Sequence, residues 1–383
     1  MTMKILIGIS RRYPFYAGAL LVFTLSMSAC DLVDSGPKES SLRAAGVLVA
    51  NGGNFGDQNG FLTSYDPTSD VVVHGPSLGG FLHGLKLHEN RIYALLNTFS
   101  LGRIDVLDAS TLDRVGQYAD LPAPRAMAIS GDVAYVTNLI FGQNGTVNTI
   151  SLASGEISDP LEVGSIPEGI LMAGDRVYVA NSGLLGAGTT LSIIDPDEST
   201  VSTIDIGCDG PRDLFVDNDG EIVILCSGKT LYNDDFTSIL SRTNGQIVFF
   251  DSETDTVRER IDLETQLGTT NGTIAGYYSP DASELYAVSG EDNSIYRIDT
   301  DRNEIAATFV LPLENGLIGI SGIAYDASQE RLYVGRFPKS GAGPFPDFTS
   351  SGTVVILDRD GVETGSFEIG PAPSQIVLLP SER

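Results

Sequence analysis

The chain contains no tryptophan, only three histidines and only three cysteines among its 383 residues. Copper clusters and haem attachment need several histidines or a CxxCH motif, and the sequence has neither. His83 and His88 lie five positions apart on a strand-like run, so their side chains point to opposite faces. The sequence therefore predicts no metal site and no resident cofactor.

Positive charge is also scarce. The chain has 23 Lys and Arg against 50 Asp and Glu, a formal net charge of −27 at pH 7. Because nucleic-acid binding needs a positive footprint, this composition argues against a nucleic-acid partner and against wide contact with anionic lipid. An acidic, lysine-poor surface suits a saline habitat, and it equally serves to keep an exported protein soluble.

Motifs that carry catalysis are missing too. There is no GxSxG elbow and no phosphate-binding P-loop. Six aspartates recur at one place in the repeat described below, which indicates turn chemistry rather than catalysis: Asp66, Asp108, Asp195, Asp251, Asp299 and Asp358. Residues 217–221 superficially resemble a calcium loop but lack the EF-hand spacing, and a hairpin turn is the stronger interpretation. We therefore predict that the protein is not an enzyme.

The chain is instead rich in short strand-like runs that repeat. In residues 174–207, three runs rich in Val, Ile, Thr and Tyr are separated by turn residues. The first of these runs recurs at residues 46–51, 91–97, 133–138, 176–181, 221–226, 284–289 and 331–336. Most intervals are between 41 and 47 residues, and one is 63. About four short strands in such a period are typical of a β-propeller blade.

A further strand precedes every first run except the opening one, and its counterpart occurs at residues 373–380. The simplest interpretation is a blade shared between the two ends of the chain, which leaves no exposed sheet edge. We therefore predict an all-β, seven-bladed β-propeller with four-stranded blades. The ring is closed by the C-terminal strand joining the N-terminal blade, and the domain spans residues 44–383.

The runs VAYVTN (133–138) and RVYVAN (176–181) resemble the YVTN family of β-propeller proteins. The resemblance covers about residues 45–380. It implies the fold and says little about function, because these propellers serve many roles.

Residues 1–29 have the pattern of a bacterial export signal, with a basic start, a short apolar core and small residues directly before Cys30. That ending resembles a lipobox, in which Cys30 becomes the lipidated N-terminus, although Met27 stands where Leu is commonest. The alternative is an ordinary cleaved signal with an incidental cysteine. Residues 30–43 are polar and contain Gly, Pro and Ser, as in a flexible tether.

The resemblance to a lipoprotein implies an exported protein of the bacterial cell envelope, held at a membrane only by its N-terminal lipid. We expect the outer membrane or cell surface, and the periplasmic face of the inner membrane is the alternative.

Cys208 and Cys226 are expected to form a disulfide. They lie at the same end of a hairpin that turns at residues 218–220. Export favours oxidation, and a bridge over a loop of this size stabilises the fold by about 3 kcal/mol. The alternatives are a buried free thiol or two unpaired cysteines.

The long connections are expected on one face of the propeller, at residues 227–244, 263–272, 311–320 and 337–351. Long loops on one side of a rigid scaffold are where binding usually occurs. Arginines and aromatic residues gather there, a common recognition composition. The candidate ligand-binding residues are Arg125, Arg212, Tyr232, Phe236, Arg336 and Phe337. Alternatively, these aromatic side chains pack the loops onto the propeller.

These observations predict a non-enzymatic envelope lipoprotein that binds a small molecule, a glycan or an envelope protein through this face. Its layout resembles the cobalamin-capturing surface lipoproteins of Bacteroidetes, which implies cobalamin as one ligand, although no contact residue carries over. One alternative is a structural or adhesion module of the envelope. The other is a lactonase-like hydrolase, which would require His83, Arg125, Glu168 and Arg212 to cluster at the channel mouth.

Overall fold

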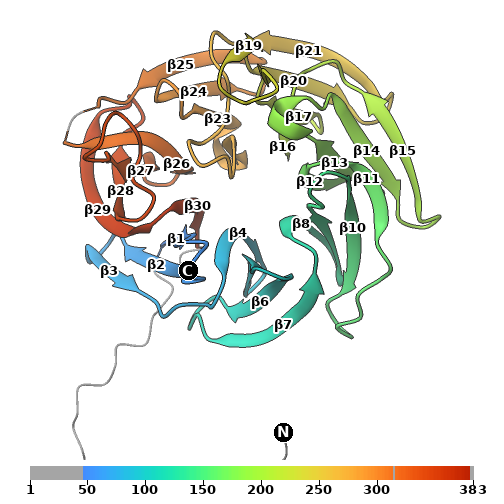
Figure 1. Ribbon diagram of the computed structural model, residues 1–383, viewed down its shortest axis with the longest axis horizontal. Helices are drawn as coiled ribbons and strands as arrows, with labels where there is room; N and C mark the ends of the chain where they lie inside the picture. The colour runs from blue at the N-terminus through green and yellow to red at the C-terminus, as the bar shows by residue number, and fades with distance from the viewer. Residues whose placement is uncertain (1–45, 314, 380–383) are drawn as a thin grey trace, which may run out of the picture. The chain divides into compact units, whose positions relative to one another are not determined.

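The computed structural model describes residues 46–313 and 315–379, which form seven four-stranded antiparallel sheets arranged as blades in a ring (Figure 1). The predicted all-β, seven-bladed propeller is confirmed. The predicted export signal (1–29) and the tether with Cys30 (30–43) lie outside the described residues. No helix in the described ranges is long and apolar enough to cross a membrane.

Each blade has four strands, ordered from the channel outward. Blade 1 contains β30 (Pro373–Leu378), β1 (Val47–Asn51), β2 (Phe61–Asp66) and β3 (Val71–His74); blade 2 contains β4 (Phe81–His88), β5 (Arg91–Asn97), β6 (Gly102–Asp108) and β7 (Arg114–Leu121). Blade 3 contains β8 (Pro124–Ser130), β9 (Val133–Asn138), β10 (Asn144–Ser151) and β11 (Leu161–Ser165); blade 4 contains β12 (Pro167–Ala173), β13 (Arg176–Asn181), β14 (Thr190–Asp195) and β15 (Thr200–Asp205).

Blade 5 contains β16 (Pro211–Val216), β17 (Ile222–Cys226), β20 (Gln246–Asp251) and β21 (Thr256–Asp262); blade 6 contains β22 (Gly276–Ser279), β23 (Glu284–Ser289), β24 (Ser294–Asp299) and β25 (Glu304–Val310). Blade 7 contains β26 (Leu317–Asp326), β27 (Arg331–Pro338), β28 (Ser351–Leu357) and β29 (Glu363–Pro371). A separate hairpin is formed by β18 (Thr230–Tyr232) and β19 (Ile239–Arg242), and two short 3-10 turns are η1 (Leu184–Gly186) and η2 (Pro280–Ala282).

Blade 1 is shared between the two ends of the described chain. Strand β30 pairs antiparallel with β1, with Val47 opposite Leu378. The hydroxyl of Ser374 donates to the carbonyls of Ala50 and Leu82, so β30 also contacts blade 2. The predicted closure of the ring by the C-terminal strand is confirmed.

The core lies between blades rather than inside any one of them. The second strands are buried on both faces, as the pattern of β13 shows. Tyr178 of blade 4 packs edge-on against Phe250 of blade 5, with ring centroids 6.2 Å apart. Tyr65 of blade 1 stacks on Phe367 of blade 7 at 4.1 Å. Each blade is therefore stabilised mainly by its neighbours.

The recurring aspartates form tight turns, as their period predicts. Each carboxylate accepts a hydrogen bond from the backbone N–H two residues later, for example Asp66 from Thr68 and Asp195 from Asp197. The same bond forms at Asp108, Asp251, Asp299 and Asp358. These turns lie on one face of the ring, which we name the turn face.

The asparagine that ends the second strand of several blades has a structural role at the opposite end. The amide of Asn51 donates to Thr63, and that of Asn181 donates to Ser192, each on the neighbouring third strand. Asn138 bonds Asn148 in the same way. These bonds hold the second and third strands together where the chain leaves them for the long connections.

The face that carries those connections is named the long-loop face. It holds the connections between second and third strands and those from each outer strand to the next inner strand. Because Val47 pairs with Tyr65 next to the turn at Asp66–Asp70, the described chain enters blade 1 at the turn face. The two faces therefore differ in both loop length and chain entry.

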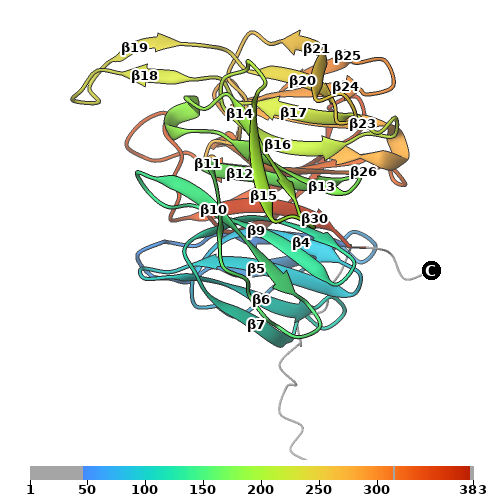
Figure 2. The same ribbon diagram turned by 90° about the vertical axis from the view of Figure 1, so that its right-hand side faces the viewer.

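The longest predicted loop differs from expectation. Residues 227–244 contain the hairpin β18–β19, which reaches beyond the other strands on one side of the ring (Figure 2). Strands β26 and β27 also extend to Leu317 and Pro338, into segments expected to be loops.

Candidate functional site

Exposed apolar side chains gather on the long-loop face. Nineteen large apolar side chains are exposed in the described ranges, and twelve of them lie in connections between second and third strands. These twelve are Phe55, Phe99, Leu101, Phe141, Leu184, Leu185, Leu231, Phe236, Ile239, Leu240, Phe345 and Phe348. The exposed apolar side chains of the described ranges are therefore concentrated in one class of connection on one face.

Four of these connections, in blades 1 to 4, form a surface that we name the apolar arc: residues 52–60, 98–101, 139–143 and 182–189. Asp57 is the single charged residue in these ranges, although charged residues make up 19% of the chain. Phe55 and Phe99 meet edge-on at 5.3 Å, and Phe141 is 81% exposed. Depletion of charge together with exposed aromatic rings is the composition of an interface core.

Blade 5 carries a raised element on the same face, named the arm, residues 227–245. All four residues of β19 are exposed, including Ile239 and Leu240. At the tip, Phe236 is 66% exposed and lies 5.9 Å from the ring of Tyr232. Phe236 has a φ of 55°, a left-handed conformation that bulky residues rarely adopt.

The base of the arm is fixed by Gln266. Its amide group donates to the carbonyls of Lys229 and Thr243, at 2.9 and 3.0 Å, and its carbonyl accepts from Arg242 at 2.7 Å. Arg242 also forms an ion pair with Glu291 at 2.5 Å. The arm is therefore held by polar bonds at its base, and its tip is closed by Asn233, whose side-chain carbonyl accepts the N–H groups of Thr237 and Ser238.

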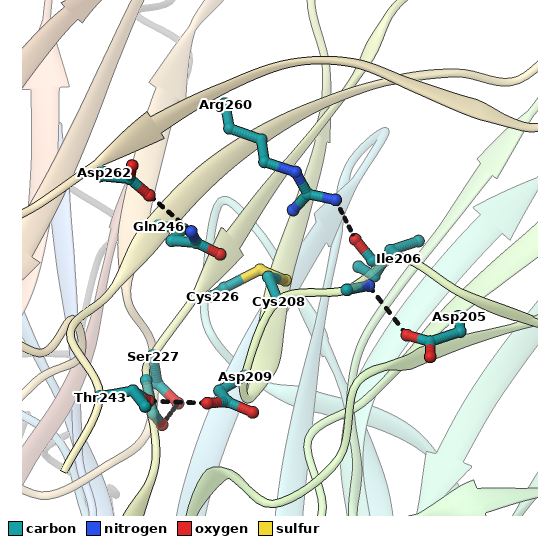
Figure 3. The surroundings of a disulfide bond; sticks show 12 residues. Asp205, Ile206, Cys208, Asp209, Cys226, Ser227, Thr243, Gln246, Arg260 and Asp262 are labelled. Atoms are coloured by element: carbon teal, nitrogen blue, oxygen red, sulfur yellow. Dashed lines mark hydrogen bonds between the residues drawn. A yellow bond between two sulfur atoms is a disulfide. The ribbon is translucent and has the colours of Figure 1, made fainter.

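The disulfide between Cys208 and Cys226 secures the same region, as predicted (Figure 3). It joins the segment before β16 to the end of β17, directly before the arm, with 6.1 Å between the Cα atoms. Beside it, the hydroxyl of Thr243 donates to Asp209 at 2.8 Å. A disulfide indicates an oxidising, exported compartment.

The mouth of the central channel brings together four residues that the sequence singled out. Arg125 binds the carboxylate of Glu168, with Nη2 2.7 Å from Oε1, and Arg212 approaches the same oxygen at 3.6 Å. Nη1 of Arg125 lies 3.3 Å from Nδ1 of His83. Arg212 also donates to the carbonyl of Gly272. Two arginines thus share one carboxylate, in a protein that is otherwise strongly acidic.

His83 is neutral in this cluster. Burial, followed by the charges of Arg125 and Arg212, holds the pKa of His83 well below its usual range. The four residues of the lactonase-like hypothesis are therefore adjacent, and the cluster combines two cations, one anion and a neutral imidazole. Its single carboxylate is occupied by the ion pair with Arg125.

Two candidate ligand-binding residues, Arg336 and Phe337, are placed in the interior. Arg336 is 2% exposed and donates to the carbonyls of Gly319 and Pro312 and to the Asn293 side chain. Phe337 is fully buried, and its ring lies 5.0 Å from that of Phe348. Because β27 continues to Pro338, these side chains hold loops in place and do not face a ligand on the surface.

The other four candidates lie at two separate places. Tyr232 and Phe236 belong to the arm, and Arg125 and Arg212 belong to the channel mouth. Sequence reasoning missed Phe55, Leu101, Leu184, Leu185, Leu231, Ile239 and Leu240. The repeat could have identified them, because these residues lie in connections between second and third strands, the same class as the predicted loops at residues 227–244 and 337–351.

No family model and no curated protein matches the chain. Among solved structures, it is similar to a quinonprotein alcohol dehydrogenase-like protein from Bacteroides thetaiotaomicron, with a TM-score of 0.65 and 16% identity over 88% of this chain and 78% of that one. It is also similar to the dihydro-heme d1 dehydrogenase NirN, with a TM-score of 0.53 and 12% identity over 90% and 78%. Hydrazine synthase of Kuenenia stuttgartiensis gives a TM-score of 0.54 and 20% identity over 73% and 77%.

The prediction that the protein is not an enzyme is contradicted by these comparisons. It rested on missing motifs and few histidines, whereas the same fold occurs in proteins named as a dehydrogenase and a synthase. At such low identity the likeness shows the β-propeller fold alone, so it assigns no activity to this chain. In residues 46–313 and 315–379, no group of three His, Cys, Asp or Glu residues is arranged to hold a metal ion.

Proposed function

We propose that this protein is an exported, lipid-anchored β-propeller that captures a partner on its long-loop face. The observation that carries the proposal is the placement of twelve of nineteen exposed large apolar side chains in one class of connection on that face. Burying an exposed apolar side chain yields about 1.5–3 kcal/mol, so a partner that covers several of them gains substantial affinity.

The partner's contact surface is apolar and carries little charge. The apolar arc has one charged residue, and the arm balances Lys229 and Arg242 against Asp234 and Asp235. Neither place offers a complementary field to a strongly charged partner, and the net charge of −27 repels acidic molecules and attracts basic ones to the rest of the surface instead. An apolar protein surface or a large amphipathic ligand, such as the cobalamin that the lipoprotein resemblance implies, fits these properties.

The direction of chain entry supports capture away from a membrane. The described chain enters blade 1 at Val47, on the turn face. The chain therefore joins the propeller on the side opposite the apolar arc and the arm. This arrangement leaves the long-loop face free for a partner.

Two variants and one matched control test the binding face. The arc variant combines Phe99→Ser with Phe141→Ser, and the arm variant combines Phe236→Ser with Leu240→Ser. Val362→Ser removes an exposed apolar side chain from the turn face and serves as the control. Full-length proteins in detergent are screened by thermal shift against cobalamins, glycans, lactones and apolar peptides, and each reaction is checked for products by mass spectrometry.

A ligand at 100 times its Kd adds about 2.7 kcal/mol of stability, a visible shift. We expect the shift to disappear in the arc or arm variant and to persist in Val362→Ser. If no compound binds, photo-crosslinkers at positions 141 and 362 are compared in intact cells. Equal labelling from the two positions would contradict capture by the long-loop face and favour a structural or adhesion role.

Lipid anchoring is tested separately by Cys30→Ser. The variant should leave the membrane fraction, because one acyl-modified residue is the sole anchor in the proposal. Retention of the variant in membranes would refute the anchor without affecting the binding face.

A further inference from the structure

The centre of the propeller contains a cavity of about 190 Å³ that shares no lining residue with the apolar arc or the arm. Every blade contributes at least one apolar side chain to its wall from the inner strand or directly before it. Taken one from each blade, these side chains are Leu85, Met127, Ile170, Leu214, Ile274, Ile323 and Ile376. Together they form a ring, named the apolar ring, around the channel.

Three of the four charged groups in the cavity wall have partners. Arg125 and Glu168 form an ion pair at 2.7 Å. The carboxylate of Asp213 accepts the backbone N–H groups of Ala275 and Gly276. These groups are satisfied by the protein itself and need nothing from a ligand.

Lys86 is the fourth charged group, and it differs. It lies on β4 one residue beyond Leu85 of the apolar ring, and it lines the cavity. Within the described ranges its ammonium group makes no hydrogen bond or ion pair, and burial, with no compensating charge, lowers the pKa of Lys86. The side chain is partly exposed, and its ammonium group is open to solvent in the channel, which an anionic ligand would replace. The cavity therefore offers one unpaired positive charge beside an apolar surface.

We propose that this cavity binds a small organic carboxylate, with the carboxylate at Lys86 and the apolar body against the apolar ring. A cavity of about 150 Å³ with apolar walls accommodates benzene. A volume of about 190 Å³ therefore accommodates a ring or a short alkyl chain together with a carboxylate. A halide ion would pair with the charge of Lys86 but would leave most of the apolar ring uncovered, so an organic carboxylate fits the cavity better.

The test uses 4-fluorobenzoate as the probe and 4-fluorobenzamide as its neutral counterpart of nearly the same shape. Fluorine NMR linewidths are measured with the full-length protein in detergent and compared with detergent alone. We expect the benzoate to bind at least roughly tenfold more tightly than the amide, and Lys86→Met to remove that difference. Arg302→Gln, which removes an exposed positive charge on the turn face, should leave the binding unchanged.

Lys86→Met keeps the length of the side chain and removes a partly buried charge, so the variant is expected to fold, and its melting curve checks this. If it does not fold, the comparison of benzoate with benzamide still decides the result. Equal binding of the two probes, an unchanged Kd in folded Lys86→Met, or no benzoate binding up to about 10 mM overturns the proposal. Displacement of benzoate by bromide at equal concentration also overturns it, because the site would then prefer inorganic ions. None of these results affects the proposal for the long-loop face, because that face involves different residues.

Discussion

The side-chain carbonyl of Gln375 lies 2.6 Å from the backbone nitrogen of Leu85 and accepts its hydrogen bond, joining blade 1 to blade 2 beside the channel. The bond is partly buried in the wall of the central cavity, so solvent replaces it only in part when the acceptor is removed. A buried donor left unpaired costs about 1–3 kcal/mol. The bond therefore contributes to ring closure in addition to the pairing of β30 with β1.

Gln375→Met should reduce the free energy of unfolding by about 1–3 kcal/mol, because it keeps the volume of the side chain and removes the acceptor. Urea denaturation measures the change. Gln329→Met, in an exposed turn, is the control and should stay within about 0.5 kcal/mol of the parent. Equal midpoints for the two variants would show that the bond contributes nothing to closure.

Reduction of the disulfide should destabilise the protein by about 3 kcal/mol, because the open chain gains conformational freedom over the loop between Cys208 and Cys226. Guanidinium denaturation is measured with and without dithiothreitol. The double variant Cys208→Ala/Cys226→Ala should show no response to the reductant. A parent protein that is equally stable in both conditions would contradict a stabilising bridge.

Asp213→Asn should change how stability depends on pH. Burial raises the pKa of Asp213 to about 6, against an unfolded value near 4. Between these values the unfolded chain has lost its proton and the folded chain has kept it, so the stability of the parent falls as pH rises. At pH 7 the full penalty is present, up to about 3 kcal/mol and less where channel water reaches the carboxylate.

The asparagine keeps a carbonyl that accepts the same two backbone N–H groups and carries no charge. We therefore expect Asp213→Asn to be more stable than the parent at pH 7 and equal to it near pH 4. Chemical denaturation between pH 4 and pH 7 measures the difference in stability between the two proteins. The other carboxylates are the same in both, so their contributions cancel. A difference that does not vary with pH would contradict the raised pKa.

Phe236→Asn should weaken partner binding without weakening the fold. A left-handed conformation costs an ordinary residue about 1–2 kcal/mol, and asparagine tolerates it better. The variant should therefore match the parent in stability or exceed it by about 1 kcal/mol. Phe141→Asn removes another exposed ring from a position without a positive φ and should bring no such gain. Thermal melting compares the two, and a loss of stability in Phe236→Asn would show that the ring supports the fold.

The repeating parts of the fold could be predicted from sequence because each has a local cause. Alternating apolar residues define the strands, and Asp66 and its counterparts form a turn wherever they occur, since each bonds the backbone two residues on. The pairing of Cys208 with Cys226 followed from the hairpin between them. All of these depend on interactions over short stretches of chain.

The features that sequence reasoning missed depend on distant contacts. Arg336 was expected on the surface, but β27 extends further than its pattern indicates because β26 pairs with it up to Leu317 and Pro338. The position of Lys86 in the channel wall depends on a register shift between Leu82 and Gly84. Neither the length of a paired strand nor the place of a bulge is encoded in a single run of residues.

The shared blade has a consequence for biogenesis. Ser374 bonds Ala50 across 324 positions of the chain, so blade 1 cannot be completed before nearly the whole polypeptide has been synthesised and, if it is exported, translocated. Contacts between distant segments form slowly. Until β30 arrives, β1 presents an unpaired edge to other chains. Premature termination anywhere before residue 373 therefore yields a chain that cannot close and is exposed to proteolysis, rather than a partially active protein.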